Sequence, residues 1–431
     1  MGGSEGFSPA RGVAVQIVRT LREAGHEAYF AGGCVRDELL DLEPTDYDVA
    51  TDATPDRVRG LFDRTHEVGA AFGVVLVAMR GVSIEVATFR SDGPYADRRR
   101  PDSVHFSDAR ADAERRDFTV NALFLDPLAV GTGEEPERIP RDRGDLRRAV
   151  IDHVGGLADL DRRVIRAVGE PERRLGEDHL RALRAVRLAA RLGFEIDPGT
   201  SAAIRRHAID LEGVSRERIG DEIRRMMDHA TRSRAVDLLC EHGLDRPVLR
   251  EGESLRGSTV LGRLGAEVDL ALCLAAWALD RGLEPEANGE AARDLVRRWR
   301  SALCLSNAER DRLLELLRIL GAIHPDGTWS GLGVAAQKRL AAREAFADAV
   351  DVLGAWAPES DRVVRDRVRH LEQTPSGLSP EPLVTGEDLL AAGLEAGPRF
   401  AALLERVYDA QLEDRIRTRD QAMELIADLN V

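Results

Sequence analysis

The first ninety residues alternate short apolar runs with turn residues, which predicts mixed α/β structure. Apolar positions recur at helical spacing through residues 11–25, and a second helix is predicted over residues 54–62. Residues 27–33 predict a strand that runs into a turn, and residues 46–51 predict another strand. Residues 73–89 form two β-rich runs around an Arg-Gly turn, which predicts a hairpin.

The pattern changes after this part of the chain. Residues 91–115 predict a polar loop, residues 114–127 a helix followed by a strand, and residues 131–148 a charged surface insertion. From about residue 158 the pattern is helical, with predicted loops at 250–258, 283–290, 323–331 and 373–387. We therefore expect an α+β fold: a small mixed α/β head over 1–150, a helical neck over 151–235, and a helical body and tail over 236–431.

Composition narrows the class of protein. The chain has 431 residues, a net charge of −15 and four scattered cysteines, which disfavours a zinc site or a disulfide framework. No apolar run is long enough for a membrane span and no signal peptide is visible, so a cytoplasmic location is expected. Residues 161–206 carry eleven arginines against seven acidic residues, so a basic stripe and a mixed solvated surface both stay open. Oligomeric state is left undetermined.

Two aspartates stand out in the strand predicted over residues 46–51. Asp46 and Asp48 share one face of a strand because side chains alternate with period two. Two carboxylates on one face repel each other unless a cation lies between them, and Mg²⁺ prefers oxygen ligands. Glu85, on the neighbouring hairpin, is a candidate third catalytic carboxylate. The alternative interpretation of this short pattern is an ordinary edge strand.

The turn before this strand has the residue types of an anion site. Gly32 and Gly33 lie between a predicted strand and a predicted helix, where backbone N–H groups can approach a phosphate. Arg36, one turn into that helix, can bind the same phosphate. Joined as GGxVRDxxxxxxxxDxD, these features indicate a site for a nucleoside triphosphate and Mg²⁺.

This joint pattern resembles the nucleotidyltransferase superfamily that includes tRNA CCA-adding enzymes and bacterial poly(A) polymerases, class II. Further stretches resemble family elements: ERRDFTVNALFLDP at 114–127, GGLADLDRRVIRAVGEP at 155–171, EDHLRALRAVRLAARLGFEI at 177–196, VSRERIGDEIRRMM at 214–227 and LVTGEDLLAAGLEAGP at 383–398. The loop at 88–104 resembles one found in members that add the terminal A as well as the C residues.

The resemblance suggests roles for two further elements. It implies that Arg116 contacts the nucleotide, and Asp117 and Asn121, four residues apart, can bind ribose hydroxyls. It assigns base selection to Asp178 and Arg181, with further nucleotide contacts by Arg184 and Arg187. A carboxylate and a guanidinium can pair with cytosine and adenine but not with uracil or guanine. An intrahelical salt-bridge ladder is the alternative for these four residues.

The implied activity is Mg²⁺-dependent, template-independent addition of CCA to the 3′ end of tRNA, with CTP and ATP as donors. A-adding or poly(A) polymerase activity is the alternative within the same chemistry. The run VGAAFGVVLV after the acidic pair lacks the arginines of a typical polyadenylating enzyme. Nucleotidyl transfer to a small molecule and a non-catalytic RNA-binding module are further alternatives. His105 and His179 are expected to be surface or packing residues.

Overall fold

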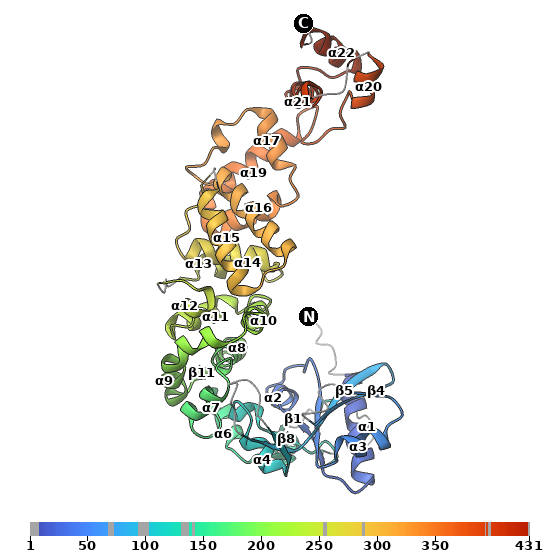
Figure 1. The fold of residues 1–431 in the computed structure, drawn as a ribbon, viewed down its shortest axis with the longest axis vertical. Coiled ribbons are helices and arrows are strands. Elements are labelled where there is room, and N and C mark those ends of the chain that lie inside the picture. The colour runs from blue at the N-terminus through green and yellow to red at the C-terminus, as the bar shows by residue number, and fades with distance from the viewer. Residues whose placement is uncertain are drawn as a thin grey trace. The chain divides into compact units, whose positions relative to one another are not determined.

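The computed structural model describes residues 8–67, 73–93, 103–130, 138–139, 143–252, 257–286, 289–392, 394 and 398–429. These residues form two compact units (Figure 1). Unit 1 comprises Met1–Val214 and His242–Pro247, and unit 2 comprises Ser215–Glu241 and Val248–Val431. The domain boundaries at 150 and 235 stay a prediction. No helix in the described part of the chain combines the length and the apolar character that a membrane crossing requires.

Unit 1 contains a mixed sheet of seven strands in the order β3-β4-β5-β2-β1-β8-β9. Only the β2–β5 pair is parallel among the pairings described for this sheet. Its strands are β1 (Ala28–Ala31), β2 (Asp48–Thr51), β3 (Thr65–Glu67), β4 (Val74–Met79), β5 (Val82–Thr88), β8 (Phe124–Leu125) and β9 (Val150–Ile151). The hairpin predicted over residues 73–89 is confirmed, and it turns at Arg80 and Gly81 with positive φ at both.

Helices cover the sheet and bury its side chains. The helix α1 (Pro9–Glu23) packs on β1, β2 and β5, and α3 (Pro55–Leu61) packs on β4 and β5. Thr54 caps α3 and accepts a hydrogen bond from the Arg57 N–H, as the sequence predicts. One cluster of buried apolar side chains includes Ala31, Ala50, Phe89 and Phe124, and α4 (Ala109–Glu114) contributes two alanines to it.

Three stretches differ from their predictions. Residues 91–115 are not simply a loop, because β6 (Arg90–Asp92) pairs with β7 (Val104–Phe106) and Asp108 caps α4. Residues 94–102, within the loop predicted at 88–104, lie outside the described residues. In the predicted insertion at 131–148, residues 131–137 and 140–142 also lie outside them, whereas α5 (Arg143–Arg148) buries Leu146 completely.

The rest of unit 1 is mainly helical. Its elements are α2 (Gly33–Leu39), η2 (Thr119–Asn121), α6 (Gly156–Arg162), α7 (Pro171–Glu177), α8 (Arg181–Leu192), α9 (Pro198–His207) and η3 (Ala208–Gly213). Between these helices, β10 (Val164–Ile165) and β11 (Glu195–Ile196) form a two-stranded parallel sheet. Apart from Ile151, which ends β9, the regular elements of the predicted neck are therefore helical except for this small sheet.

In its described part, unit 2 consists of helices and connecting turns. This result confirms the helical structure that the sequence predicts there. The helices are α10 (Arg216–Met227), α11 (Arg232–Glu241), α13 (Thr259–Arg263), α14 (Leu270–Asp280), α15 (Glu290–Leu303), α16 (Asn307–Ile323), η4 (Trp329–Gly331), α17 (Val334–Ala341), α18 (Phe346–Trp356), α19 (Pro358–Glu372), α20 (Gly386–Ala391), α21 (Pro398–Leu412) and α22 (Arg419–Leu429), while α12 (Asp245–Leu249) spans a boundary between the units.

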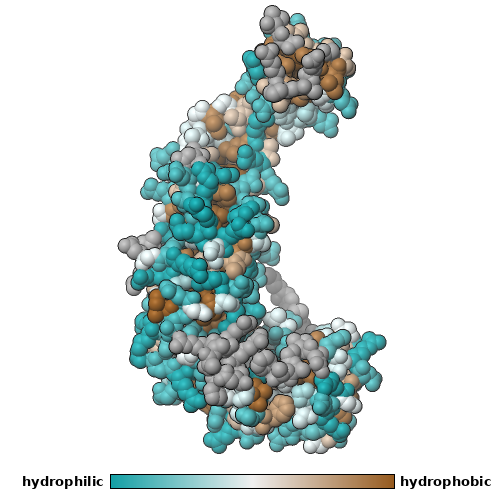
Figure 2. All heavy atoms as spheres, in the orientation of Figure 1, coloured by the Kyte–Doolittle hydropathy of each residue, from teal (hydrophilic) through white to brown (hydrophobic). Residues whose placement is uncertain are grey.

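The side chain of one lysine is buried in unit 2. Lys338 of α17 is 0% exposed. Its ammonium donates to the hydroxyls of Thr374 (2.6 Å) and Ser376 (2.7 Å) and lies 3.8 Å from Asp414. Burial lowers the pKa of Lys338, although Asp414 opposes that effect. The side drawn in Figure 2 is mostly hydrophilic where it is coloured, and apolar side chains occur there in small scattered patches.

Candidate active site

Three carboxylates gather where β2 begins. Asp48 is the first residue of β2 and lies opposite Glu85 in the parallel register with β5. The prediction that Asp46 shares this strand is wrong, since the strand starts two residues later and Asp46 is exposed ahead of it. Asp46 still acts on Asp48 electrostatically, so the two aspartates are close neighbours.

The pKa of Asp48 is raised in this group of three carboxylates. Burial raises the pKa, the negative charges of Asp46 and Glu85 raise it further, and Arg116 opposes them, so the pKa reaches about 6. Carboxylates arranged in this way are stabilised by a cation among them. A set of carboxylate oxygens is what hard divalent cations such as Mg²⁺ prefer, so the residues present fit a divalent metal ion.

Tyr47, between the two aspartates, anchors this segment from the opposite side. It is 2% exposed, and its hydroxyl donates to Glu38 Oε1 at 2.9 Å. Glu38 in turn pairs with Arg11 of α1 at 2.8 Å, and both of these side chains are 0% exposed. The sequence reasoning missed this buried chain. The available signal was Arg11, a charged residue at a core-facing position of an amphipathic helix.

The glycine turn lies between β1 and α2 as predicted. Gly32 caps α2 with a φ of 80°, a conformation that L side chains rarely adopt. A Cβ at this position would lie 3.0 Å from Arg116 Nη1, so close approach also favours glycine here. Gly33 is the first residue of α2. The turn therefore brings its backbone directly beside the Arg116 guanidinium.

Two arginines are held in fixed positions beside this turn. Arg36 is 4% exposed, pairs with Asp37 at 2.6 Å and donates to the Asn121 side chain. Arg116 donates to the Asn121 carbonyl at 3.1 Å and pairs with Asp112 at 3.0 Å. Burial tends to raise the pKa of Asp112, but Arg116 and its neighbour Arg115 outweigh burial and lower it.

Asp117 and Asn121 do not lie one turn apart on an α-helix, contrary to the prediction. Asp117 precedes the short 3₁₀ element η2, and the Asn121 amide nevertheless donates to its carboxylate at 3.2 Å. Arg184 of α8 reaches the other carboxylate oxygen with two donors, at 2.8 and 2.6 Å. Burial alone raises the pKa of Asp117, but Arg184 and Asn121 lower it to about 2.

The predicted base-selecting residues lie at the start of α8. Asp178 is not on that helix but in the turn before it, where its carboxylate accepts from the Leu180 N–H at 3.1 Å. The guanidinium of Arg181 binds Glu177 at 2.7 Å and the Arg174 carbonyl at 2.6 Å. Asp178 therefore does not share a helix with Arg181, Arg184 and Arg187. The Arg181–Glu177 pair joins the start of α8 to the end of α7, so it is not the intrahelical ladder of the alternative interpretation.

Arg184 and Arg187 are half-buried on α8, while an adjacent face of this helix packs inward. That face includes Leu183, Val186 and Ala190, which are buried. Hydrogen bonds link four of the predicted residues into one network, which runs from Arg36 through Asn121 and Asp117 to Arg184. Sequence reasoning missed Asp112 and Glu177, the carboxylates that orient Arg116 and Arg181.

Unit 2 contains a basic hollow of its own. A cavity of about 450 Å³ opens between α15 and α16 and is lined by eight residues, half of them arginines: Arg293, Val296, Arg297, Arg300, Ser301, Leu305, Arg310 and Leu314. Arginine-lined hollows of this kind suit phosphate oxygens.

Family comparisons match both units. The family described as "Poly A polymerase head domain" matches residues 28–166, and the one described as "Probable RNA and SrmB- binding site of polymerase A" matches residues 193–255. A CCA-adding enzyme of Levilactobacillus brevis is 35% identical over 91% of each chain. Another, from Limosilactobacillus fermentum, is 34% identical over 96% of this chain and 95% of its own.

Solved structures agree with these matches. The crystal structure of the Bacillus stearothermophilus CCA-adding enzyme in complex with CTP is similar over 98% of both chains, with a TM-score of 0.72 and 27% identity. The Thermotoga maritima CCA-adding enzyme complexed with tRNA covers 97% of this chain and 95% of its own, with a TM-score of 0.64. At 16% identity the latter is a likeness of fold alone.

Proposed function

This chain belongs to the family of CCA-adding enzymes, and from that premise we propose which of its residues carry out the reaction. The activity is template-independent addition of CCA to the 3′ end of tRNA, with CTP and ATP as donors and pyrophosphate as product. The single observation that supports the catalytic assignment is the β2–β5 register, which pairs Asp48 with Glu85 beside Asp46.

We propose that Asp46 and Asp48 hold a divalent metal ion, Mg²⁺, with Glu85 as the third carboxylate. When bound, this ion lowers the pKa of the RNA 3′-hydroxyl and neutralises charge on the pyrophosphate. The 3′-oxygen forms a bond to the α-phosphorus, and the bond from that phosphorus to the bridging oxygen breaks. Tyr47 fixes the spacing of the two aspartates through its hydrogen bond to Glu38.

The arginines and the glycine turn bind the triphosphate in this proposal. Arg116 lies beside Gly32 and Arg36 beside Gly33, and the carboxylate partners of both arginines fix the direction in which their remaining donors point. Gly33 leaves the backbone open to the phosphate oxygens. Because both arginines are oriented before the nucleotide arrives, little side-chain entropy is lost on binding.

Ribose and base would be read by the residues that join η2 to α8. Asp117 and Asn121 offer an acceptor and an amide to the ribose hydroxyls, and Arg184 holds the Asp117 carboxylate ionised. Asp178 and Arg181 would select cytosine and adenine, with Arg187 nearby. Glu177 holds Arg181 through Nη1 and so orients the guanidinium for this contact.

The substrate RNA needs a phosphate-binding surface as well as an active site. We propose that the arginine-lined hollow between α15 and α16 contacts tRNA phosphates. Combining Arg297→Ala with Arg300→Ala should weaken tRNA binding uniformly across tRNA species. The slope of the logarithm of the binding constant against the logarithm of salt concentration should become shallower by roughly 1–2. Arg362→Ala, on the exposed face of α19, is the matched control and should leave the slope unchanged. An unchanged slope in the double variant would show that the hollow does not contact tRNA phosphates.

The activity is tested with tRNA transcripts that end before CCA, after the first C and after CC, each offered one nucleotide. CTP should extend the first two, and ATP should extend only the third. Labelling of the CC-ending transcript alone would indicate an A-adding enzyme, and unlimited ATP tailing would indicate polyadenylation. A cytoplasmic location accompanies this proposal, because the substrate is a tRNA.

A further inference from the structure

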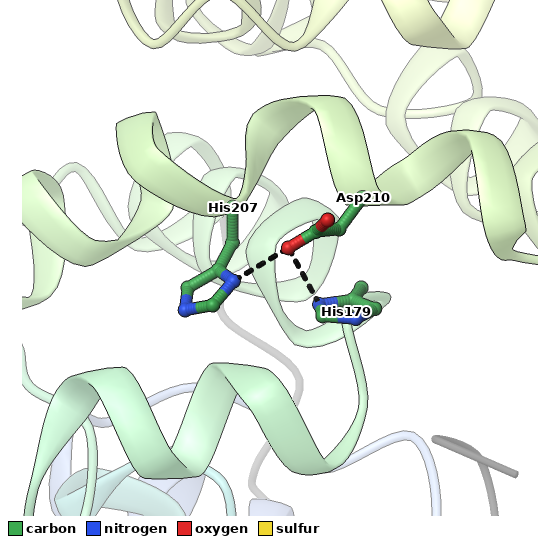
Figure 3. A group of neighbouring side chains, drawn as sticks. All are labelled: His179, His207 and Asp210. Atoms are coloured by element: carbon green, nitrogen blue, oxygen red, sulfur yellow. Dashed lines mark hydrogen bonds and ion pairs between the residues drawn. The ribbon is translucent and has the colours of Figure 1, made fainter.

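A group of metal-ligating side chains lies in unit 1 and takes no part in the reaction proposed above. It consists of His179, His207 and Asp210, and we call it the His-His-Asp cluster (Figure 3). His179 lies in the turn between α7 and α8, His207 ends α9, and Asp210 belongs to η3. Figure 3 shows both imidazole rings directed at one carboxylate oxygen of Asp210.

The distances place three donor atoms around one point. Asp210 Oδ2 lies 2.7 Å from His207 Nδ1 and 3.8 Å from His179 Nδ1. All three donor atoms lie within 4.8 Å of one another. His179 is 4% exposed, so the cluster is covered on one side, while His207 and Asp210 keep partial access to solvent. The cluster is therefore both preassembled and reachable by an ion.

The second nitrogen of His207 supports a cation in this cluster. Its Nε2 lies 3.1 Å from Glu172 Oε2, so the imidazole lies between two carboxylates. A neutral imidazole has one N–H and can donate to only one of them. If Nε2 donates to Glu172, the lone pair of Nδ1 faces the Asp210 carboxylate. Only a second proton or a metal ion makes that contact attractive.

The surroundings of His207 match those of a metal ligand. Histidines that bind metals usually donate their other N–H to a carboxylate, which fixes the tautomer. Glu172 is in the position to accept that N–H, and Arg206 pairs with the same carboxylate and holds it in place. This outer carboxylate is independent of the three donor atoms themselves, so two separate features of the structure point to the same ligand.

The spacing of the donors also fits a particular class of ion. Zinc bonds of about 2.0–2.1 Å at tetrahedral angles place ligand atoms about 3.3 Å apart. The two separations from Asp210, 2.7 and 3.8 Å, bracket this value, and all three donor atoms lie within 4.8 Å of one another, so side-chain adjustments can bring them around one ion. Two imidazoles and one carboxylate suit borderline transition metals, whereas Mg²⁺ prefers six oxygen ligands.

We propose that the His-His-Asp cluster binds one Zn²⁺-class transition-metal ion, with a water molecule as the fourth ligand. The bound ion joins the turn before α8, which carries Asp178, to the end of α9 and to η3. It is thus a structural site for the start of α8, separate from the divalent ion at Asp46 and Asp48. This proposal stands on the cluster itself and does not depend on the proposed function.

The first test uses Co²⁺ and Zn²⁺ alone as probes on the full chain after EDTA treatment and its removal. Co²⁺ should give the intense visible absorption of a four-coordinate site, saturating at one ion per chain, and Zn²⁺ should displace it. His207→Gln should abolish this absorption, whereas His153→Gln, at an exposed histidine, should keep it. Absence of the absorption from the wild-type protein, or its persistence in His207→Gln, would overturn the proposal.

Two further variants separate this site from loss of folding and from the acidic centre. Glu172→Gln changes only the outer carboxylate and should weaken Co²⁺ binding by roughly 10–100-fold while the far-UV circular dichroism stays unchanged. Full affinity in Glu172→Gln would contradict the assigned tautomer. Asp48→Asn should leave the Co²⁺ absorption unchanged. Its loss in that variant would place the ion at the acidic centre and overturn the proposal.

Discussion

Replacing Asp117 with asparagine should destabilise the protein at neutral pH and have less effect in acid. Asp117 accepts two hydrogen bonds from Arg184, one from the Asn121 amide and one from the Phe118 N–H. These donors outweigh burial and lower the pKa of Asp117 from 3.8 to about 2. A shift of this size corresponds to at most about 2.5 kcal/mol of folding free energy.

Solvent screening reduces this upper limit on the free energy. The Arg184 side chain is 36% exposed, while that of Asp117 is 10% exposed. We therefore expect Asp117→Asn to cost about 1–2 kcal/mol. Because the folded pKa is the lower one, the ionised carboxylate contributes fully above about pH 5. Its contribution falls as the pH drops from about 4 through about 2, so the two proteins should converge in stability in that range.

The measurement is urea unfolding of both proteins, monitored by far-UV circular dichroism and by pulsed hydrogen exchange of peptides from residues 114–192. Tryptophan fluorescence reports only on unit 2, which holds all four tryptophans, Trp277, Trp299, Trp329 and Trp356. Asp161→Asn is the matched control, because Asp161 makes a similar two-donor pair with Arg147 but is 59% exposed. It should cost less than about 0.5 kcal/mol. Equal losses in the two variants, or a loss for Asp117→Asn that persists at low pH, would refute this reasoning.

Three further substitutions test other parts of unit 1. Asp48→Asn should reduce CTP incorporation by more than about 100-fold and remove the thermal stabilisation by added Mg²⁺; a retained Mg²⁺ shift would move the metal elsewhere. Gly32→Ala should destabilise by about 1–2 kcal/mol and raise the KM for CTP, since its φ is 80° and the new Cβ would press on Arg116. An unaltered KM would argue against a phosphate contact there. Arg11→Met should cost about 3–5 kcal/mol in urea unfolding, because Glu38 would stay buried without its partner. Adding Glu38→Gln to Arg11→Met should recover part of that loss, and no recovery would contradict the charge explanation.

The sequence was sufficient for elements whose hydrophobic period is long or whose turn chemistry is strong. The helix over residues 11–25 and the hairpin over residues 73–89 follow directly from these signals. Short elements were harder to predict. Residues 91–115 contain few apolar positions, yet Asp108 caps a helix there and a three-residue strand pair forms. Elements of three to six residues are too short for a hydrophobic period to show, so the local pattern carries little information about them.

The site was predicted by residue type better than by geometry. Asp46 and Asp48 were expected on one strand by alternation, but the strand begins at Asp48. Asp117 and Asn121 were expected on a helix, but a 3₁₀ turn brings them together. The orienting carboxylate Glu177 could not be identified from the sequence, because acidic residues are frequent near arginines throughout this chain. Which of them is a partner depends on side-chain directions that only the folded structure defines.

The burial of Lys338 has a consequence for chemical labelling. It is the only lysine in the chain, so it carries the only side-chain amine available to acylating reagents. In the folded protein that amine is enclosed by Thr374 and Ser376. An amine-reactive ester can acylate this amine only when α17 and its neighbours open. The labelling rate therefore measures how often that region opens. Lysine-directed modifications, whether enzymatic or synthetic, have no other side chain to use while this segment stays closed.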